Sequence, residues 1–268
     1  MSAYAQKAKR ASRRVRHKLA RLIAPELEAE LRATKRKLKK ARAETAYDLP
    51  DELEATIARA RDEHLTYLKP DNLRELAARV LDAEKQGLDG LVIEAGTARG
   101  GSAIVMAAAK APERPMKVYD VFGMIPPPSA QDGEDVHARY ATITAGEARG
   151  PGGETYYGYR DDLYTEVEQS FARLGVPTGE RNVELIKGLF EDTIDLDEPV
   201  AIAHLDGDWY ESTMTCLVRI APLVVPGGRI VLDDYYAWSG CRTAVDEYFK
   251  DREGWRTEHG SRLHVVRV

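Results

Sequence analysis

Short apolar runs alternate with segments of helical periodicity over the C-terminal three quarters of the chain. Each run is about five residues long and ends in polar or turn-forming residues, which is typical of buried parallel strands. The runs cover residues 90–94, 116–121, 183–187, 201–205 and 228–232. A final strand or hairpin is expected over 255–268, and a helix over 102–110. The alternation predicts an α/β fold built on a doubly wound, mostly parallel sheet.

Helical periodicity continues upstream of the first strand, over residues 51–87, and is broken at Lys69-Pro70. Residues 1–50 have a different character. Residues 1–18 form a basic arm, and a helix is expected from Pro25 because acidic residues occupy its first turns and basic residues its last turns. We therefore divide the chain into an arm and helix, residues 1–50, and a single domain, residues 51–268.

The net charge of −5 hides a division along the chain. Residues 1–44 hold 15 Lys and Arg against 4 Glu, whereas the remainder holds 24 basic against 40 acidic residues. A basic N-terminus can bind nucleic acid or an anionic membrane. Its narrow apolar stripe instead favours a packing helix, so we expect a homodimer and no nucleic-acid partner. Membrane contact through the arm is the alternative.

The chain contains no apolar run near the ~20 residues that a membrane span requires. The N-terminus lacks the apolar centre of a signal peptide, and the two cysteines, Cys216 and Cys241, are not spaced like metal ligands. These features predict a cytoplasmic protein.

Residues 123–160 break the alternation of strands and helices. The segment contains three consecutive prolines, 126–128, together with many glycines and tyrosines. An irregular segment of this length in a compact domain usually has a function. Because it follows the second strand, we interpret it as a lid or substrate-recognition insertion. A peripheral or oligomer-contact excursion is the alternative.

Two apolar runs end in paired carboxylates. Asp206 and Asp208 follow one run, and Asp233 and Asp234 follow the other. If both strands lie in one sheet, all four carboxylates meet at the edge where α/β proteins bind ligands. So much negative charge requires protons or a cation. The pattern therefore predicts a divalent metal site, although Asp233 and Asp234 could simply cap a helix.

The first strand runs into a glycine-rich turn, residues 94–102. The turn is neither a phosphate-binding loop nor a dinucleotide fingerprint, because it lacks the spacing of both. Glu94 would repel a pyrophosphate but attract an amine, as in loops that bind S-adenosylmethionine. Asp120, at the end of the second strand, could hold the hydroxyls of a ribose. Phe190 could flank an adenine or belong to the core.

Four motifs in this order resemble one group of enzymes. They are E-x-G-x-x-x-G-G-S at 94–102, K-G-x-F-x-D-T at 187–193, L-D-G-D-x-Y-x-S-T at 205–213 and P-G-G-x-I-x-L-D-D-Y at 226–235. Together they resemble the Mg²⁺-dependent sugar O-methyltransferases of the macrocin, mycinamicin and noviose type, whose fold is a Rossmann-like class I methyltransferase. The resemblance covers roughly residues 91–250. A related similarity, to the mycobacterial mannoside 1-O-methyltransferase of methylmannose polysaccharide synthesis, makes a methylated mannoside one candidate product.

The resemblance implies a role for each matching residue. The residues that would contact S-adenosylmethionine are Glu94, Gly96, Thr97, Ser102 and Asp120. Those that would hold Mg²⁺ are Asp206, Asp233 and Asp234. Asp208 would be the general base. This chemistry is reasonable because a sugar hydroxyl needs a cation and a base to become a nucleophile, whereas a sulfonium donor needs no acid.

Several assignments stay open at this stage. His137, in the lid segment, is an alternative base because imidazole titrates near neutrality. His204 could support the metal site or belong to the core. Tyr210, Tyr235 and Tyr236, with Trp209 and Trp238, could form the floor of a carbohydrate site or pack in the core. The acceptor could instead be a catechol-like phenol, or the chain could be a binding module that works through its basic arm.

Overall fold

The computed structural model describes residues 47–268. The basic arm and the helix expected from Pro25 lie outside this range, and so does the dimer contact assigned to them. No helix within the described range is long and apolar enough to cross a membrane.

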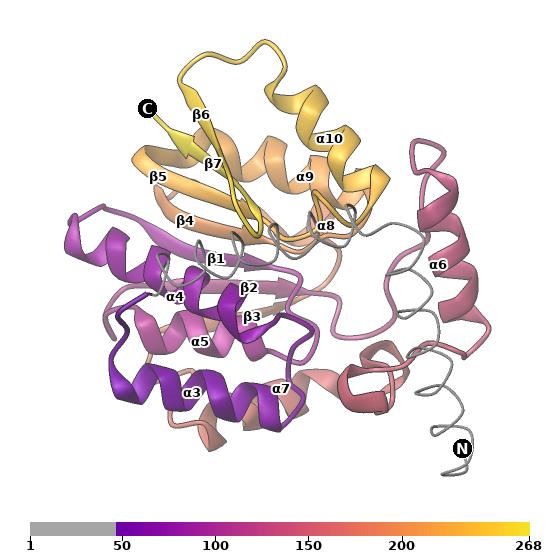
Figure 1. Cartoon of the computed structure of the whole chain (residues 1–268), viewed down its shortest axis with the longest axis horizontal. Coiled ribbons are helices and arrows are strands. Elements are labelled where there is room, and N and C mark those ends of the chain that lie inside the picture. The colour runs from indigo at the N-terminus through magenta and orange to yellow at the C-terminus, as the bar shows by residue number, and fades with distance from the viewer. Residues whose placement is uncertain (1–46) are drawn as a thin grey trace, which may run out of the picture. The chain divides into compact units, whose positions relative to one another are not determined.

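A seven-stranded sheet forms the centre of the domain, with strand order β3-β2-β1-β4-β5-β7-β6 (Figure 1). The strands are β1 Leu91–Ala95, β2 Met116–Asp120, β3 Val183–Lys187, β4 Val200–Leu205, β5 Val224–Leu232, β6 Trp255–His259 and β7 Leu263–Arg267. β1 to β5 are parallel, and the hairpin β6–β7 adds two antiparallel strands. The predicted doubly wound, mostly parallel sheet is confirmed, with strand ends shifted by a few residues at most.

The direction of winding reverses between β1 and β4. From β1 the chain builds β2 and β3 on one side, and it then crosses back to build β4 and β5 on the other. In such sheets the crevice outside the carboxyl ends at the reversal point is where ligands bind. The glycine turn follows β1 and the carboxylates follow β4 and β5, so both predicted motifs meet there.

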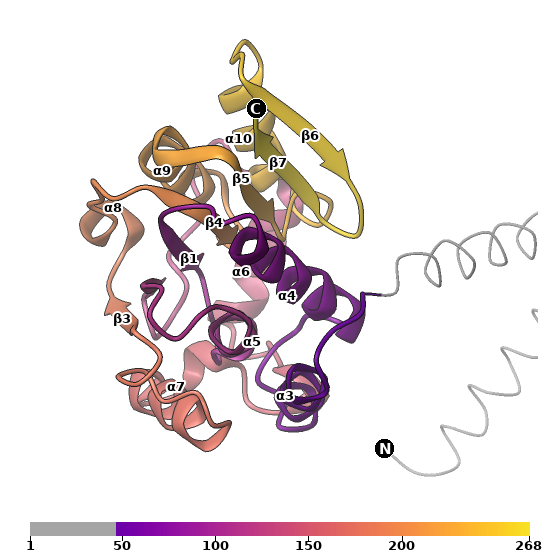
Figure 2. The same ribbon diagram turned by 90° about the vertical axis from the view of Figure 1, so that its left-hand side faces the viewer.

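Helices cover both faces of the sheet (Figure 2). One layer consists of α3 Asp51–Asp62, α4 Pro70–Lys85, α5 Gly101–Ala109 and α7 Leu163–Arg173. The other consists of α8 Phe190–Thr193, α9 Tyr210–Ile220, the 3₁₀ turn η3 Ala221–Leu223 and α10 Ser239–Phe249. Alternate strand residues face the two layers: Val92 packs in the first core and Ile93 in the second. The break predicted at Lys69-Pro70 is confirmed, because Pro70 is the first residue of α4, where its missing N–H costs nothing.

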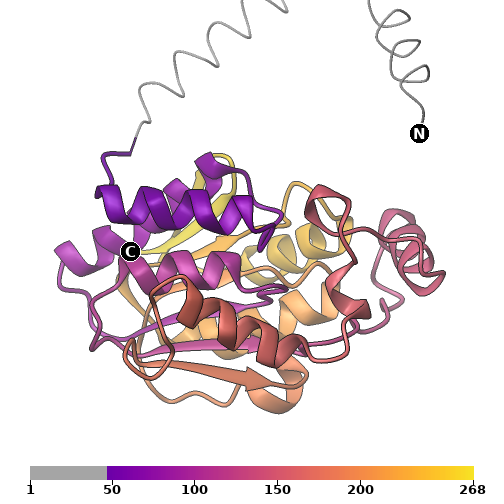
Figure 3. The same cartoon turned by 90° about the horizontal axis from the view of Figure 1, so that it is seen from below.

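The predicted lid contains α6 Glu134–Thr144 and two 3₁₀ turns, η1 Pro151–Gly153 and η2 Tyr157–Tyr159. It lies beyond the end of the sheet toward which the parallel strands point (Figure 3). The lid packs around its own small core, whose buried members are Ile125, Val136, Ile143, Ala148, Tyr156 and Trp209. Hydrogen bonds tie the lid to the segments that follow β4 and β5. Trp209 Nε1 donates to the Pro126 carbonyl at 3.0 Å, the Tyr210 N–H donates to Asp132 at 2.9 Å, and the Ser239 N–H donates to Asp135 at 3.0 Å.

Candidate active site

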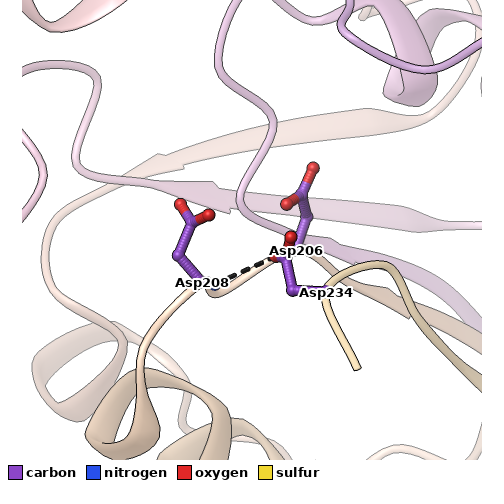
Figure 4. Close-up of side chains that lie close together, drawn as sticks. All are labelled: Asp206, Asp208 and Asp234. Atoms are coloured by element: carbon purple, nitrogen blue, oxygen red, sulfur yellow. Dashed lines mark hydrogen bonds between the residues drawn. The ribbon is translucent and has the colours of Figure 1, made fainter. Parts of the chain in front are cut away.

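Three carboxylates converge at the ends of β4 and β5. Leu205 pairs with Leu232 across the two strands, so the residues that follow each strand meet. Asp206, Asp208 and Asp234 each offer one oxygen atom, and these atoms lie within 4.8 Å of one another (Figure 4). The Asp208 N–H also donates to Asp234 Oδ2 at 3.2 Å, the bond drawn in Figure 4. An all-oxygen donor set of this kind suits Mg²⁺.

The backbone at Asp208 is strained. Its φ of 56° lies in the left-handed region, which a residue with a Cβ seldom adopts and which costs about 1 kcal/mol or more. The left-handed turn brings the side chain back beside Asp206 and Asp234. Local strain held in place by surrounding structure is a common feature of active sites.

The three carboxylates destabilise one another's charged form. Burial, followed by the charges of the neighbouring aspartates, raises the pKa of Asp206 and of Asp208 well above the ordinary range. The same two causes raise the pKa of Asp234 to about 6. A divalent cation among them would remove this repulsion, so the electrostatics of the cluster fit a metal ion.

Asp233 is held in a different way. Arg262, in the turn of the β6–β7 hairpin, grips both of its oxygens, with Nη2 at 3.0 Å from Oδ2. His204 Nε2 lies 3.5 Å from Asp233 Oδ1. Burial opposes the ionisation of Asp233, but His204 and Arg262 outweigh it and hold its pKa below the ordinary range. The structure therefore groups Asp208, rather than the expected Asp233, with Asp206 and Asp234, because Asp233 already has a cationic partner.

His204 links the two halves of the site. The ring is buried, with Nδ1 at 3.6 Å from Glu94 Oε1 and Nε2 next to Asp233. Although burial lowers its pKa, the two carboxylates raise the value to about 9. His204 therefore lies buried between Glu94 of the glycine turn and Asp233 beside the carboxylate cluster, and its support of the metal site stays a prediction.

A first cavity lies over the glycine turn, where the cofactor is expected. Among its lining residues are Gly96, Asp120, Phe190, Asp206 and Asp208. Phe190 thus lies in the cavity wall while also packing at the edge of the core. Gly96 has a φ of 89°, and a Cβ there would lie 2.0 Å from the Asp206 carbonyl oxygen, so the turn requires glycine.

The other expected cofactor residues lie behind this cavity wall. Glu94 is completely buried and accepts a hydrogen bond from the Ser102 hydroxyl. The Thr97 N–H donates to Asp120 Oδ2 at 2.8 Å, and the Ala98 N–H donates to the same oxygen at 3.0 Å. Asp120 therefore braces the glycine turn as well as lining the cavity. Glu94 Oε2 and Thr97 Oγ1 are buried without a hydrogen-bond partner in the described chain, so the turn keeps polar capacity for a ligand.

A second cavity, of about 230 Å³, separates the carboxylates from the lid. It shares Gly96, Asp120, Asp206 and Asp208 with the first cavity, so the two are neighbours. Its lining combines five aspartates with a single arginine, Arg139, and five aromatic residues, Tyr67, Tyr156, Tyr157, Trp209 and Trp238. This cavity is the natural place for an acceptor, next to both the carboxylates and the cofactor position.

Four residues expected at the site lie elsewhere. Tyr210 donates to Glu247 at 2.6 Å and Tyr235 donates to Asp246 at 2.8 Å, both away from the cavities. Tyr236 is 44% exposed beside His259. His137 is exposed on α6. None of the four lines either cavity, because acidic partners on α10 and open solvent draw these side chains outward.

The aromatic residues that do line the acceptor cavity were found only in part. Trp209 and Trp238 were candidates, and Tyr156 and Tyr157 belong to the tyrosine-rich lid. Tyr67 precedes α4 and carries no signal in the sequence, because only the tertiary fold brings it to this cavity.

Comparison with known proteins decides the family. The family model described as Macrocin-O-methyltransferase (TylF) matches residues 2–257. The chain belongs to this family. It is therefore an O-methyltransferase, as the four motifs indicated.

Curated relatives are about 30% identical to this chain. Mycinamicin III 3''-O-methyltransferase of Micromonospora griseorubida is 31% identical over 198 residues, which are 70% of this chain and 71% of the relative. The 8-demethyl-8-(2,3-dimethoxy-alpha-L-rhamnosyl)-tetracenomycin-C 4'-O-methyltransferase of Streptomyces olivaceus is 32% identical over 184 residues, 66% of this chain and 64% of that protein.

Solved structures agree on the fold. The O-methyltransferase NovP superimposes with a TM-score of 0.62 at 24% identity, covering 78% of this chain and 88% of NovP. CalS11, a calicheamicin methyltransferase, superimposes with a TM-score of 0.55 at 17% identity, covering 89% and 92%. The fold is that of a class I, Rossmann-like methyltransferase, which implies S-adenosylmethionine as the methyl donor.

Proposed function

We propose that this protein is a Mg²⁺-dependent enzyme that transfers the methyl group of S-adenosylmethionine to a sugar hydroxyl of a glycoside or oligosaccharide. The observation that carries the proposal is the convergence of Asp206, Asp208 and Asp234 between a cofactor cavity and an acceptor cavity. The names of the two curated relatives, which include a rhamnosyl-tetracenomycin methyltransferase, support a sugar as the methylated group. A mannoside is one acceptor of this class.

The residues fit a magnesium ion. Asp206 and Asp234 would hold it, because each supplies a carboxylate oxygen to the cluster and neither has a cationic partner like the one that occupies Asp233. When bound, Mg²⁺ supplies a Lewis acid that lowers the pKa of an acceptor hydroxyl. Asp233, fixed by Arg262 and His204, adds negative charge beside the cluster without needing to contact the ion.

Asp208 is proposed as the base that accepts the hydroxyl proton. It lines both cavities, so its carboxylate reaches the region where acceptor and donor meet. His137 has no such position. The sulfur of the donor leaves without protonation, and the two cavities supply the alignment that methyl transfer requires.

Exchange of one carboxylate tests the proposal. Asp234 lines the acceptor cavity but not the cofactor cavity. Asp234→Asn should therefore lower the rate of methyl transfer by roughly 100-fold or more while the Kd for S-adenosylhomocysteine stays within a few-fold. Transfer from tritiated S-adenosylmethionine to a panel of glycosides measures the first quantity, and calorimetry measures the second.

Asp161→Asn is the matched control, because Asp161 is exposed just after the lid and its substitution removes the same charge as Asp234→Asn. If Asp234→Asn transferred methyl at the rate of this control, the metal assignment would fail. Loss of cofactor binding in Asp234→Asn would contradict it as well.

A catechol-like phenol is the second candidate acceptor, because the walls formed by Tyr67, Tyr156, Trp209 and Trp238 would also accept a flat ring. Catechols in the same acceptor panel separate the two candidates. Methyl transfer to catechols but to none of the glycosides would replace the sugar proposal.

A further inference from the structure

Arg139 lines the acceptor cavity. It lies on α6 of the lid, and the carboxylate cluster lines the same cavity. Its guanidinium carbon lies 5.6 Å from the centre of the Tyr156 ring, so Arg139 and Tyr156 form a cation–π contact. Within residues 47–268, Arg139 forms no hydrogen bond and no ion pair.

The other arginines near the site are all engaged. Arg99 pairs with Glu154, Arg160 pairs with Glu166, and Arg262 pairs with Asp233. The partly buried Arg139 side chain keeps five N–H donors that no group within residues 47–268 accepts, and a cation that lines a cavity can pair with an anion there. The partner is then expected to come with the ligand.

Asp208 is not the partner of the Arg139 guanidinium. Arg139 and Asp208 line the same cavity. The two side chains nevertheless do not form an ion pair. Arg139 and the carboxylates therefore line one cavity without pairing with one another, and this cavity is where an acceptor would lie.

We propose that Arg139 recognises an anionic group on the acceptor, so that the preferred substrate is a sugar carrying a phosphate or carboxylate near the hydroxyl that is methylated. The planar guanidinium would bind two oxygens of that group side by side. This inference rests on the proposed function, since it names the class of acceptor for the same cavity.

Binding measurements test the inference without requiring turnover. Trp209 and Trp238 line the cavity, so their fluorescence can report ligands there. With Mg²⁺ present, glucose 6-phosphate and methyl glucuronide should bind the wild type at least tenfold more tightly than methyl glucoside. Arg139→Gln should reduce that preference roughly 10- to 100-fold, and Arg139→Lys should keep part of it. The phosphate and the carboxylate ligands show which anion the cavity prefers.

Arg149→Gln is the matched control. Arg149 is an exposed lid residue that lines neither cavity, and its loss changes the net charge equally. The inference is contradicted if the wild type binds the neutral glycoside as tightly as both anions. It is also contradicted if Arg139→Gln leaves the preference intact or if Arg149→Gln reduces it equally. Near-ultraviolet circular dichroism checks the folding of each variant, and Arg139→Lys provides the reading if Arg139→Gln is unfolded.

Methyl transfer to the same three sugars separates this inference from the proposed function. If methyl transfer to methyl glucoside were at least as efficient as to either anion, only the role of Arg139 would be contradicted, and the proposed function would stand. Anion binding that depends on Arg139, without transfer to any sugar, would contradict the proposed function and leave the anion site standing.

Discussion

Replacement of Arg262 by Gln should destabilise the domain even though Arg262 belongs to no strand or helix. Its guanidinium neutralises Asp233, whose side chain is only 10% exposed and which precedes Asp234 directly. Without Arg262, Asp233 would lose its nearer cationic partner beside Asp206 and Asp234. His204, 3.5 Å from Asp233, would remain as a counter-charge.

The magnitude follows from how deeply the pair is buried. Removing one member of a fully buried ion pair costs about 3–5 kcal/mol. The Arg262 side chain is 25% exposed and His204 persists, so water and the imidazolium offset part of this cost. We expect Arg262→Gln to lower the free energy of unfolding by about 2–3 kcal/mol.

Urea unfolding followed by circular dichroism measures this loss, in EDTA so that no cation substitutes for the guanidinium. Arg256→Gln is the control: Arg256 pairs with Glu258 on the surface, with 56% of its side chain exposed, and should cost about 0.5 kcal/mol or less. Adding Asp233→Asn to Arg262→Gln should restore part of the stability. A loss in Arg262→Gln no larger than in the control would refute the reasoning.

Two further predictions concern single residues, His264 and Gly96. His264 is buried against the Arg229 guanidinium, and burial followed by that charge lowers its pKa to about 3, below the ordinary 6.5. The unfolded chain therefore takes up a proton that the folded chain refuses. Stability present above pH 6.5 is lost toward pH 3, so the wild type should lose about 2 kcal/mol more than His264→Asn between pH 7 and 5 in urea titrations. Equal losses would contradict this. Gly96→Ala should raise the Kd for S-adenosylhomocysteine at least tenfold in calorimetry, because its Cβ would overlap the Asp206 carbonyl oxygen. Gly87→Ala, with a φ of 62° and no atom near the new Cβ, should leave the Kd unchanged, and equal Kd values in both variants would exclude the overlap as the cause.

The sequence could predict the position of the site because the relevant signals are local. Asp206 and Asp234 follow apolar runs directly, and parallel neighbouring strands bring their carboxyl ends together. Gly96 follows the first strand in the same way. Ligands of such sheets bind outside the carboxyl ends of the strands, so the fold class and the region of the cavities could be predicted from the pattern.

The partners of individual side chains could not be predicted in this way. Arg262 reaches Asp233 from a hairpin turn 29 residues further along the chain, and no residue next to Asp233 in the sequence indicates this ion pair. Tyr210 and Tyr235 turn toward acids on α10, because the packing of α9 and α10 decides which direction is open. The outward position of the two tyrosines and the grouping of Asp208 with the cluster are therefore products of tertiary structure.

The dependence of methyl transfer on magnesium tests the central claim most directly. The full chain is stripped with EDTA, dialysed, and assayed with tritiated S-adenosylmethionine and a glycoside panel while Mg²⁺ is added back. We expect transfer to fall by roughly 100-fold or more without the ion and to return as Mg²⁺ fills the site formed by Asp206 and Asp234. Undiminished transfer to a sugar in excess EDTA would contradict the account.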